Sequence, residues 1–360
     1  MLSRLNPLRS ARVSIAAKSQ GHGVAGGRHL GRVSPAIGAP LAAVCAYDAN
    51  HRYREAALIF DKDGKVLKSL SAPGATFREV AWSPNGDRLA YVLESPHEER
   101  ITQLHVYDVQ AQMSLPIAEE SLNVWPAFSR DGNVLAWVRR PEISGENGGN
   151  PQQILLHDMR TGGQRRIGLK PGEYAFAVRW SPADDSIAVA VTTTSFSNDQ
   201  PKFHRDLSLI SPGEEMARLT TFGDVGRYAW AWSPDGQGIA LVRNIATDQN
   251  ARGGPAGIWI VDVKTKIPRR APTGEELNGL SIESLSWHPS GKWLFLSAYN
   301  GPERSVYRLD VTSGEIKRLT SNSGSEYGEY WPAVGGIVFL RNGSEIWTCR
   351  HDGSRAGRLL

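Results

Sequence analysis

Along this chain, short apolar runs alternate with turn-forming residues at a regular distance. The clearest stretch is Arg227 to Arg243, in which an alternating aromatic segment leads through the turn Ser233–Gly236 into the apolar run Ile239–Val242. Proline presets the backbone angle that the second turn position needs, and Asp and Gly accept the bends that follow. A short run rich in β-branched residues is typical of a buried strand. The stretch therefore predicts a hairpin of two short strands.

The same pattern recurs along the chain. Each copy has a Trp-Ser-Pro-Asp-Gly-like turn, complete or degraded, followed by four or five apolar residues, and successive copies lie 46 to 55 residues apart. In the degraded last copy, Trp331–Ala333 matches Trp125–Ala127, which places its anchor at Val334. The seven anchors are Val33, Trp82, Phe128, Trp180, Trp232, Trp287 and Val334.

The second half of each repeat is also regular. An apolar strand that ends in Asp is followed by a turn and a basic–apolar strand, as in Val306–Asp310 and Ile316–Thr320. Four short antiparallel strands with a period near fifty residues are typical of one propeller blade. We therefore predict an all-β fold, a seven-bladed β-propeller of four-stranded antiparallel blades, over residues 31–360. The alternative is six blades plus an irregular N-terminal segment.

Residues 1–30 differ from the rest in composition. They contain several basic residues and no acidic one, and the first acid is Asp48. A secretory signal needs a longer apolar core than Val13–Ala17 provides. We interpret these residues as a disordered tail, and an organellar transit peptide is the alternative.

Composition and charge exclude several classes of function. The net charge of +4 is spread over the repeats without a basic run, which argues against nucleic-acid binding. The longest apolar stretch, Pro40–Tyr47, is too short to span a membrane as a helix. Two cysteines, Cys45 and Cys349, cannot form a disulfide-rich scaffold, and we expect two buried thiols rather than a bridge. The eleven tryptophans are best explained by packing between blades.

Catalytic motifs are few. Gly353–Gly357 has the wrong order for the G-x-S-x-G nucleophile elbow, and the chain has no Walker loop and no H-E-x-x-H motif. His51, His97 and His204 fall on loops of one face and could bind a metal together, although we interpret them as exposed loop histidines. His288 replaces Ser in the turn motif, where we expect local hydrogen bonding. We therefore expect no metal and no cofactor.

The predicted binding face carries the longer loops. Loops between the second and third strands emerge beside the connections between repeats, and binding residues concentrate on such loops. The first strand of each blade lines the central channel, and we place the candidate site at its mouth, near the starts of these strands. For the aromatic candidates, packing between blades is the alternative. The candidates are Arg78, Glu79, Trp125, Phe176, Tyr228, Trp230, Glu283, Tyr330 and Trp331.

The repeated Trp-Ser-Pro-Asp-Gly followed by Leu/Ile-Ala-x-Val resembles the TolB-type, WD-like β-propeller repeat. The resemblance covers about residues 31 to 360, and its best copies are 232–242, 82–92, 180–191 and 287–296. It implies a propeller fold and a periplasmic location. The acid-free start lacks a secretory core, so the compartment stays open.

These observations favour a non-catalytic scaffold that binds a protein or peptide partner at the channel mouth. We expect a monomer, without nucleic acid and without a transmembrane segment. One alternative is a metal-dependent propeller enzyme, such as a polysaccharide lyase of the oligogalacturonate-lyase kind. The other is a binder of a small ligand or a sugar.

Overall fold

A computed structural model describes most of the chain. The described residues are 30–46, 56–72, 74–95, 101–140, 152–197, 200–213, 215–244, 256–273, 277, 280–300, 303–320, 325–342 and 344–360. Residues 1–29, which carry the predicted tail, lie outside them.

The described strands form five four-stranded sheets and one seven-stranded sheet. The seven-stranded sheet arises because β8 (Met113–Phe128) pairs with β7 through its first half and with β9 through its second half. We name its two parts sheets B and C, and the others sheets A and D to G. Sheet A contains β1 (Leu30–Pro35), β2 (Leu41–Ala46), β3 (Ala56–Asp61) and β4 (Val66–Ser71). Sheet B contains β5 (Thr76–Trp82), β6 (Arg88–Glu94), β7 (Thr102–Asp108) and the first half of β8. Sheet C contains the second half of β8, β9 (Val134–Arg140), β10 (Gln153–Asp158) and β11 (Gln164–Gly168).

The remaining four sheets repeat the same order. Sheet D contains β12 (Glu173–Trp180), β13 (Ile187–Ser197), β14 (Gln200–Ile210) and β15 (Met216–Arg218). Sheet E contains β16 (Val225–Trp232), β17 (Gly238–Asn244), β18 (Ala256–Asp262) and β19 (Pro268–Arg270). Sheet F contains β20 (Ser281–Trp287), β21 (Trp293–Asn300), β22 (Glu303–Asp310) and β23 (Ile316–Arg318). Sheet G contains β24 (Ser325–Trp331), the 3₁₀ turn η3 (Pro332–Val334), β25 (Gly336–Arg341), β26 (Glu345–Arg350) and β27 (Gly357–Arg358).

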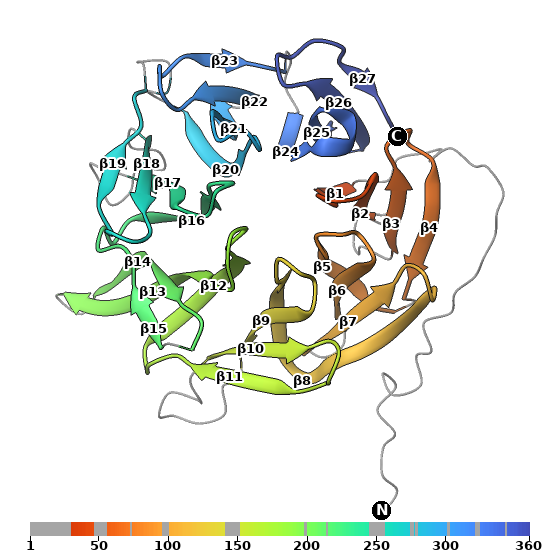
Figure 1. The fold of residues 1–360 in the computed structure, drawn as a ribbon, viewed down its shortest axis with the longest axis horizontal. Helices are drawn as coiled ribbons and strands as arrows, with labels where there is room; N and C mark the ends of the chain where they lie inside the picture. Colours follow the sequence, from red (N-terminus) through yellow and green to blue (C-terminus); the bar gives the residue numbers. More distant parts are fainter. Residues whose placement is uncertain are drawn as a thin grey trace, which may run out of the picture.

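The sheets stand in a ring, and the first strand of each lies nearest its centre (Figure 1). Their strands pair antiparallel with their sequence neighbours. Sheet A packs on sheet G, because Val33 and Phe60 share one buried cluster with Trp331 and Val338. Sheet G is built from its own strands β24 to β27. The ring therefore closes by packing between the first and last sheets.

The turn-motif tryptophans join neighbouring sheets. The indole N–H of each donates to a backbone carbonyl on the innermost strand of the preceding sheet, at 3.0 or 3.1 Å. This bond confirms that the repeated Trp acts in packing between sheets, as the sequence predicts. The pairs are Trp82 with Ser34, Trp180 with Ala127, Trp232 with Arg179, and Trp287 with Ala231.

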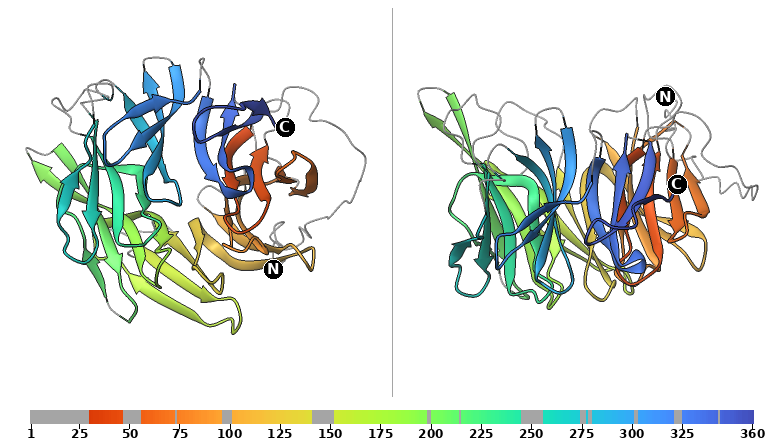
Figure 2. Two further views of the ribbon diagram at one scale, coloured as in Figure 1. Left: turned by 45° about the horizontal axis from the view of Figure 1, so that its top comes forward. Right: turned by 90° about the horizontal axis from the view of Figure 1, so that it is seen from above.

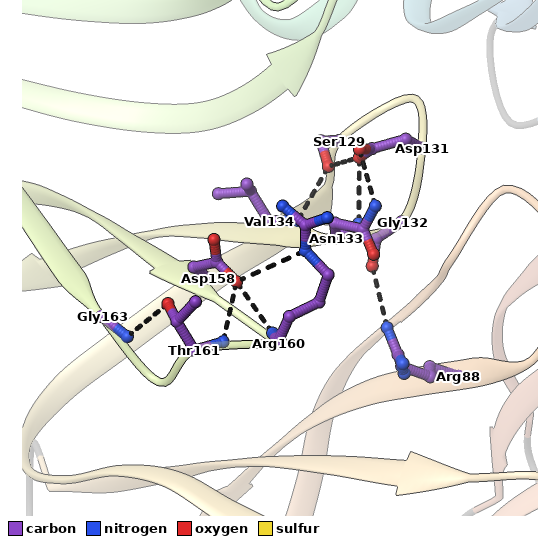
Figure 3. Close-up of polar contacts among 10 residues, drawn as sticks. All are labelled: Arg88, Ser129, Asp131, Gly132, Asn133, Val134, Asp158, Arg160, Thr161 and Gly163. Atoms are coloured by element: carbon purple, nitrogen blue, oxygen red, sulfur yellow. Dashed lines mark hydrogen bonds and ion pairs between the residues drawn. The ribbon is translucent and has the colours of Figure 1, made fainter.

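The turn itself is held by a carboxylate, as Figure 3 shows for sheet C. Asp131 Oδ1 accepts hydrogen bonds from the Ser129 hydroxyl at 2.7 Å and from the Asn133 backbone N–H at 3.0 Å. Gly132 takes a positive φ of 72°, which glycine adopts without steric cost. The Gly132 carbonyl then accepts from Arg88 Nη1 at 3.1 Å, so the turn also ties sheet C to sheet B.

Replacing Asp131 with alanine is expected to lower the free energy of unfolding by about 1 kcal/mol at neutral pH. The Ser129 and Asn133 bonds lower the pKa of Asp131 to about 2 from 3.8. This stabilisation is therefore present above pH 3.8 and is lost as the pH falls towards 2. Urea unfolding at neutral pH and near pH 2 measures the effect of the substitution and its loss on acidification. Asp63→Ala is the control, because exposed Asp63 has only an ion pair with Lys62, and its change should be smaller.

The predicted register of the last repeat is wrong. Tyr330 pairs with Ile337, as Trp232 pairs with Ile239, so Tyr330 occupies the anchor position that the sequence assigned to Val334. The 3₁₀ turn η3 replaces the longer Trp-Ser-Pro-Asp-Gly turn. The match between Trp331 and Trp125 therefore does not hold in space.

The sequence placed His204 on a loop, and this prediction is wrong for the segment 195–205. Strands β13 and β14 continue through it, and the pairing extends from Ile187–Ile210 to Ser197–Gln200. A run of threonines, Thr192–Thr194, favours extended structure here. The hairpin projects beyond the neighbouring sheets (Figure 2). His204 therefore lies on a strand.

Two smaller observations bear on function. Cys45 and Cys349 are buried, and no disulfide joins them. Over the described part of the chain, no helix combines the length and the apolar character that crossing a bilayer requires.

Candidate functional site at the inner rim

Each innermost strand is irregular near its start. The pairing of every first strand with its neighbour shifts register there. Such β-bulges redirect side chains and are frequent beside binding sites. The sequence did not reveal them. The shifts lie between Leu30 and Val33, Phe77 and Glu79, Val124 and Ala127, Phe176 and Val178, Val225 and Trp230, Ile282 and Ser284, and Glu326 and Glu329.

Several predicted site residues lie at these bulges. Arg78, Trp125 and Glu283 are among the residues that the pairing skips, and Glu79 and Phe176 are next to them. We call the bulges, together with the ends of the second strands opposite them, the inner rim. The inner rim is the predicted channel-mouth face, because the loops between second and third strands leave from it.

The backbone of the inner rim is strained at two positions. Trp125 has a φ of 55° and Ala177 a φ of 62°, although both are non-glycine residues. Residues with side chains rarely adopt this left-handed conformation, and strain of this kind concentrates at functional sites. The Trp125 ring lies next to Phe176 of the next sheet, and the ring centroids are 5.5 Å apart.

Arg140 lies against both rings. Its guanidinium carbon is 4.7 Å from the Trp125 ring centroid and 5.0 Å from the Phe176 ring centroid. Arg140 Nη2 also donates to the Ala175 carbonyl at 3.4 Å. A cation over an aromatic face is attracted by the ring quadrupole. Trp125, Phe176 and Arg140 form one half-buried platform between sheets C and D.

Arginines beside aromatic rings recur around the rim. Arg243 lies 4.3 Å from the Phe222 ring centroid and forms two bonds to Asp224, at 2.8 and 3.0 Å. Arg304 lies 4.1 Å from the Tyr299 ring centroid and 3.1 Å from Glu283. Sequence reasoning missed these arginines. For Arg140 and Arg243 the available signal was an Arg at the end of an apolar second strand, as in Val138–Arg140 and Val242–Arg243. Arg304 lies near the start of the third strand β22 and has no such signal.

The two predicted charged residues of sheet B, Arg78 and Glu79, both bind neighbouring residues. Glu79 Oε2 accepts a hydrogen bond from the Trp125 backbone N–H, which joins the innermost strands of sheets B and C. Arg78 forms an ion pair with Glu94 at 2.8 Å. These contacts fix the shape of the rim.

Beyond the platform residues and the charged residues Arg78, Glu79 and Glu283, four predicted site residues remain, and Tyr228 and Trp230 lie at the bulge of β16. Trp230 is fully buried with the Arg179 guanidinium 4.5 Å from its ring, and Arg179 Nη1 donates to the Trp230 carbonyl. The sequence predicted that Tyr330 and Trp331 lie near the start of a first strand. They lie at the end of β24, because the repeat register differs there. Tyr228 is in β16, but its side chain lies outside the described residues.

Of the three histidines that could bind a metal together, the structure describes only His204. His51 and His97 lie outside the described residues, and His204 Nε2 is 2.9 Å from the Ser195 hydroxyl. Among the described residues, no group of three or more His, Cys, Asp or Glu side chains could hold a metal ion. His288 makes the predicted local bond, since its Nδ1 accepts from the Ser290 backbone N–H at 3.1 Å.

Comparisons with known proteins identify the fold. No protein-family model matches the chain. The β-propeller domain of the trilobed protease from Pyrococcus furiosus is similar over 92% of this chain and 98% of that domain, with 14% identity and a TM-score of 0.67. The chain is a β-propeller. The propeller also matches acylaminoacyl peptidase of Pyrococcus horikoshii, with 14% identity and a TM-score of 0.64, over 92% of this chain but only 52% of that one.

Two further similarities broaden the picture. An oligogalacturonate lyase, solved in complex with manganese, matches 80% of the propeller and 79% of its own chain, with 16% identity and a TM-score of 0.58. In sequence, an uncharacterized protein of Agrobacterium fabrum is 20% identical over 137 residues. That match spans 38% of the propeller chain and 41% of the relative. At these identities the comparisons support the fold alone.

Proposed function

We propose that this β-propeller is a non-catalytic scaffold that binds a protein or peptide partner at the inner rim. The observation that carries the proposal is the platform of Trp125, Phe176 and Arg140 between sheets C and D. A half-buried aromatic pair next to an arginine has the residue types that contribute most to protein interfaces.

The rim is also preorganised. Ion pairs and hydrogen bonds hold Arg78, Glu79 and Glu283, and the bulged backbone fixes the direction of Trp125. A site that is ordered before binding loses little conformational entropy when the ligand arrives. This supports recognition of an extended segment laid across the rim.

We also propose a blade count, the bounds of the domain and the type of propeller. Sheets B and C are counted as separate blades, which makes seven, and the domain is proposed to cover residues 31–360. The Trp N–H bonds between sheets occur at the turn motif that resembles the TolB-type repeat, which supports placing the chain with propellers of that type.

A peptide-display experiment tests the proposed site. We expect a random peptide library to yield sequences that bind the wild-type propeller, and Trp125→Ala and Arg140→Ala each to weaken them about tenfold or more. Trp293→Ala is the matched control, because half-buried Trp293 begins β21, at the opposite end of a sheet from the rim. Affinity is measured by isothermal titration calorimetry on variants whose thermal unfolding matches the wild type.

Two results would contradict the scaffold. One is that selected peptides bind Trp125→Ala and Trp293→Ala equally well. The other is that the purified full chain carries stoichiometric manganese and cleaves oligogalacturonate, which would favour the metal-dependent lyase instead. Elemental analysis and an absorbance assay for unsaturated sugar products measure this second outcome.

A further inference from the structure

One position on the third strand carries a different type of side chain in sheet D than in sheets E to G. In sheets D to G, an arginine on the outermost strand pairs directly with a residue of the third strand. That residue is aromatic in three sheets and serine in sheet D. The pairs are Trp259–Arg270, Tyr307–Arg318, Trp347–Arg358 and Ser208–Arg218.

The aromatic residue fills space between neighbouring sheets. Trp259 packs in the cluster between sheets D and E, where its ring centroid is 5.6 Å from that of Phe222. Tyr307 packs in the corresponding cluster between sheets E and F. Ser208 pairs with Val189, which faces sheet C, so the shorter side chain leaves space between sheets C and D.

A pocket of about 190 Å³ lies at this place, lined by Ser208 and its neighbours. We call it the Ser208 pocket. A cavity of about 150 Å³ in another protein accommodates benzene, so the Ser208 pocket has room for a ligand of similar or slightly larger size. Unlike an apolar cavity, it is lined mainly by polar and charged side chains, among them Lys170, Glu173, His204, Asp206 and Arg218.

The buried end of the pocket is acidic. Asp206 is only 7% exposed, and its Oδ1 accepts hydrogen bonds from the Thr220 hydroxyl at 2.7 Å and from the Gly223 N–H at 3.1 Å. These bonds fix the carboxylate. Among the described residues, no Lys, Arg or His forms an ion pair with Asp206. A buried carboxylate without a cation is costly, and a ligand ammonium would compensate it.

The exposed part of the lining carries two basic residues, and half-buried Glu173 adds one carboxylate. Lys170 and Arg218 are exposed, and within the described residues neither side chain has a carboxylate partner. Arg218 also lacks the aromatic neighbour that the equivalent arginines have across the strand pair. Two cations at the opening suit a ligand carboxylate.

We propose that the Ser208 pocket binds a small zwitterion, such as an α-amino acid with a short side chain. Its ammonium group lies against Asp206, and its carboxylate lies between Lys170 and Arg218. This site is separate from the inner-rim platform and does not depend on the peptide-binding proposal.

Calorimetric titration of the full chain with glycine and L-alanine tests the site. We expect saturable binding to the wild type, a loss of about 10- to 100-fold with Asp206→Asn, and no binding to Ser208→Tyr. The tyrosine restores the side chain that sheet F has at this position, so the variant is expected to unfold at the wild-type temperature or above. Arg218→Ala should weaken binding, whereas Arg318→Ala, its equivalent in sheet F, should not.

Methylamine, acetate and inorganic phosphate separate the contributions of the two charges. Each should bind at least tenfold more weakly than glycine, because each satisfies only one end of the pocket. The proposal is overturned if neither amino acid binds at about 10 mM, a concentration that would nearly saturate a millimolar site. Equal binding by folded Ser208→Tyr, or binding by phosphate or methylamine that matches glycine, would also overturn it.

Discussion

Trp331→Ala is expected to lower the free energy of unfolding by about 3–5 kcal/mol, a large share of the total stability of a folded domain. Trp331 is 0% exposed, and its ring meets Phe60 of sheet A edge to face, with centroids 6.1 Å apart. It belongs to the cluster that joins sheets A and G, so the cavity would open where the ring closes.

Urea unfolding, followed by both tryptophan fluorescence and circular dichroism, measures the loss. Hydrogen exchange should show weaker protection in β1 and β24 than in sheet D, because closure depends on the altered contact. Trp125→Ala is the control, since Trp125 is only half buried at the inner rim and should cost less. A loss below about 1 kcal/mol for Trp331→Ala, or exchange that rises equally in all sheets, would disprove the role of Trp331 in closure.

The second large effect is a fall in stability between neutral pH and pH 4, governed by His105. His105 is buried in β7, where its ring stacks on Tyr91 at a centroid distance of 5.2 Å. Its Nε2 is 3.2 Å from Gln103 Oε1, while its Nδ1 has no hydrogen-bond partner among the described residues. Burial lowers the pKa of His105 from 6.5 to about 4, because a second proton would have to be buried on Nδ1.

Because the pKa of His105 is lower in the folded protein than in the unfolded chain, the stability falls as the pH decreases. The unfolded chain binds this proton more readily, so the contribution of His105 to stability is complete above pH 6.5 and is lost as the pH falls towards 4. A shift of this size corresponds to roughly 3 kcal/mol at the acidic limit. His157 and His288 have lowered pKa values as well, mainly through burial, and add to the same trend.

His105→Leu tests the assignment, because Leu155 occupies the equivalent place in sheet C. Each residue stands three positions before the Asp that ends the third strand, in β7 and in β10. The variant should retain its stability better than the wild type when the pH falls from 7 to 4, as measured by urea midpoints across that range. The reciprocal Leu155→His should make the dependence steeper. Parallel pH profiles for the wild type and His105→Leu would exclude His105 as the cause.

The repeat pattern was sufficient to predict the sheets and their order, because the turn and the strands of each copy are encoded by residues within that copy. The anchor tryptophans also revealed the packing between sheets, since their N–H bonds recur at the same place. The anchor of the last sheet was assigned wrongly, because the short 3₁₀ turn η3 shifts it to Tyr330. The hairpin around Ser197 was mistaken for a loop because polar residues there conceal its pairing.

The candidate site was harder to predict than the fold. Trp125 and Phe176 were identified from their place in the chain, but Arg140 was not, because its contact with both rings depends on how sheets C and D meet. The bulges of the innermost strands likewise arise from curvature around the ring and leave no fixed sequence signal. The Ser208 pocket is visible only when residues of different repeats are compared at the same register.

The uninterrupted strand β8 has a mechanical consequence. Its backbone runs from the outer edge of sheet B to the inner edge of sheet C, and both halves are hydrogen-bonded to their neighbours. The pairing passes from β7 to β9 between Ser121 and Leu122, so no unpaired loop separates the two sheets. We expect this junction to be stiffer than the junctions at which a loop connects two sheets, and the Trp125 bulge lies on the same strand.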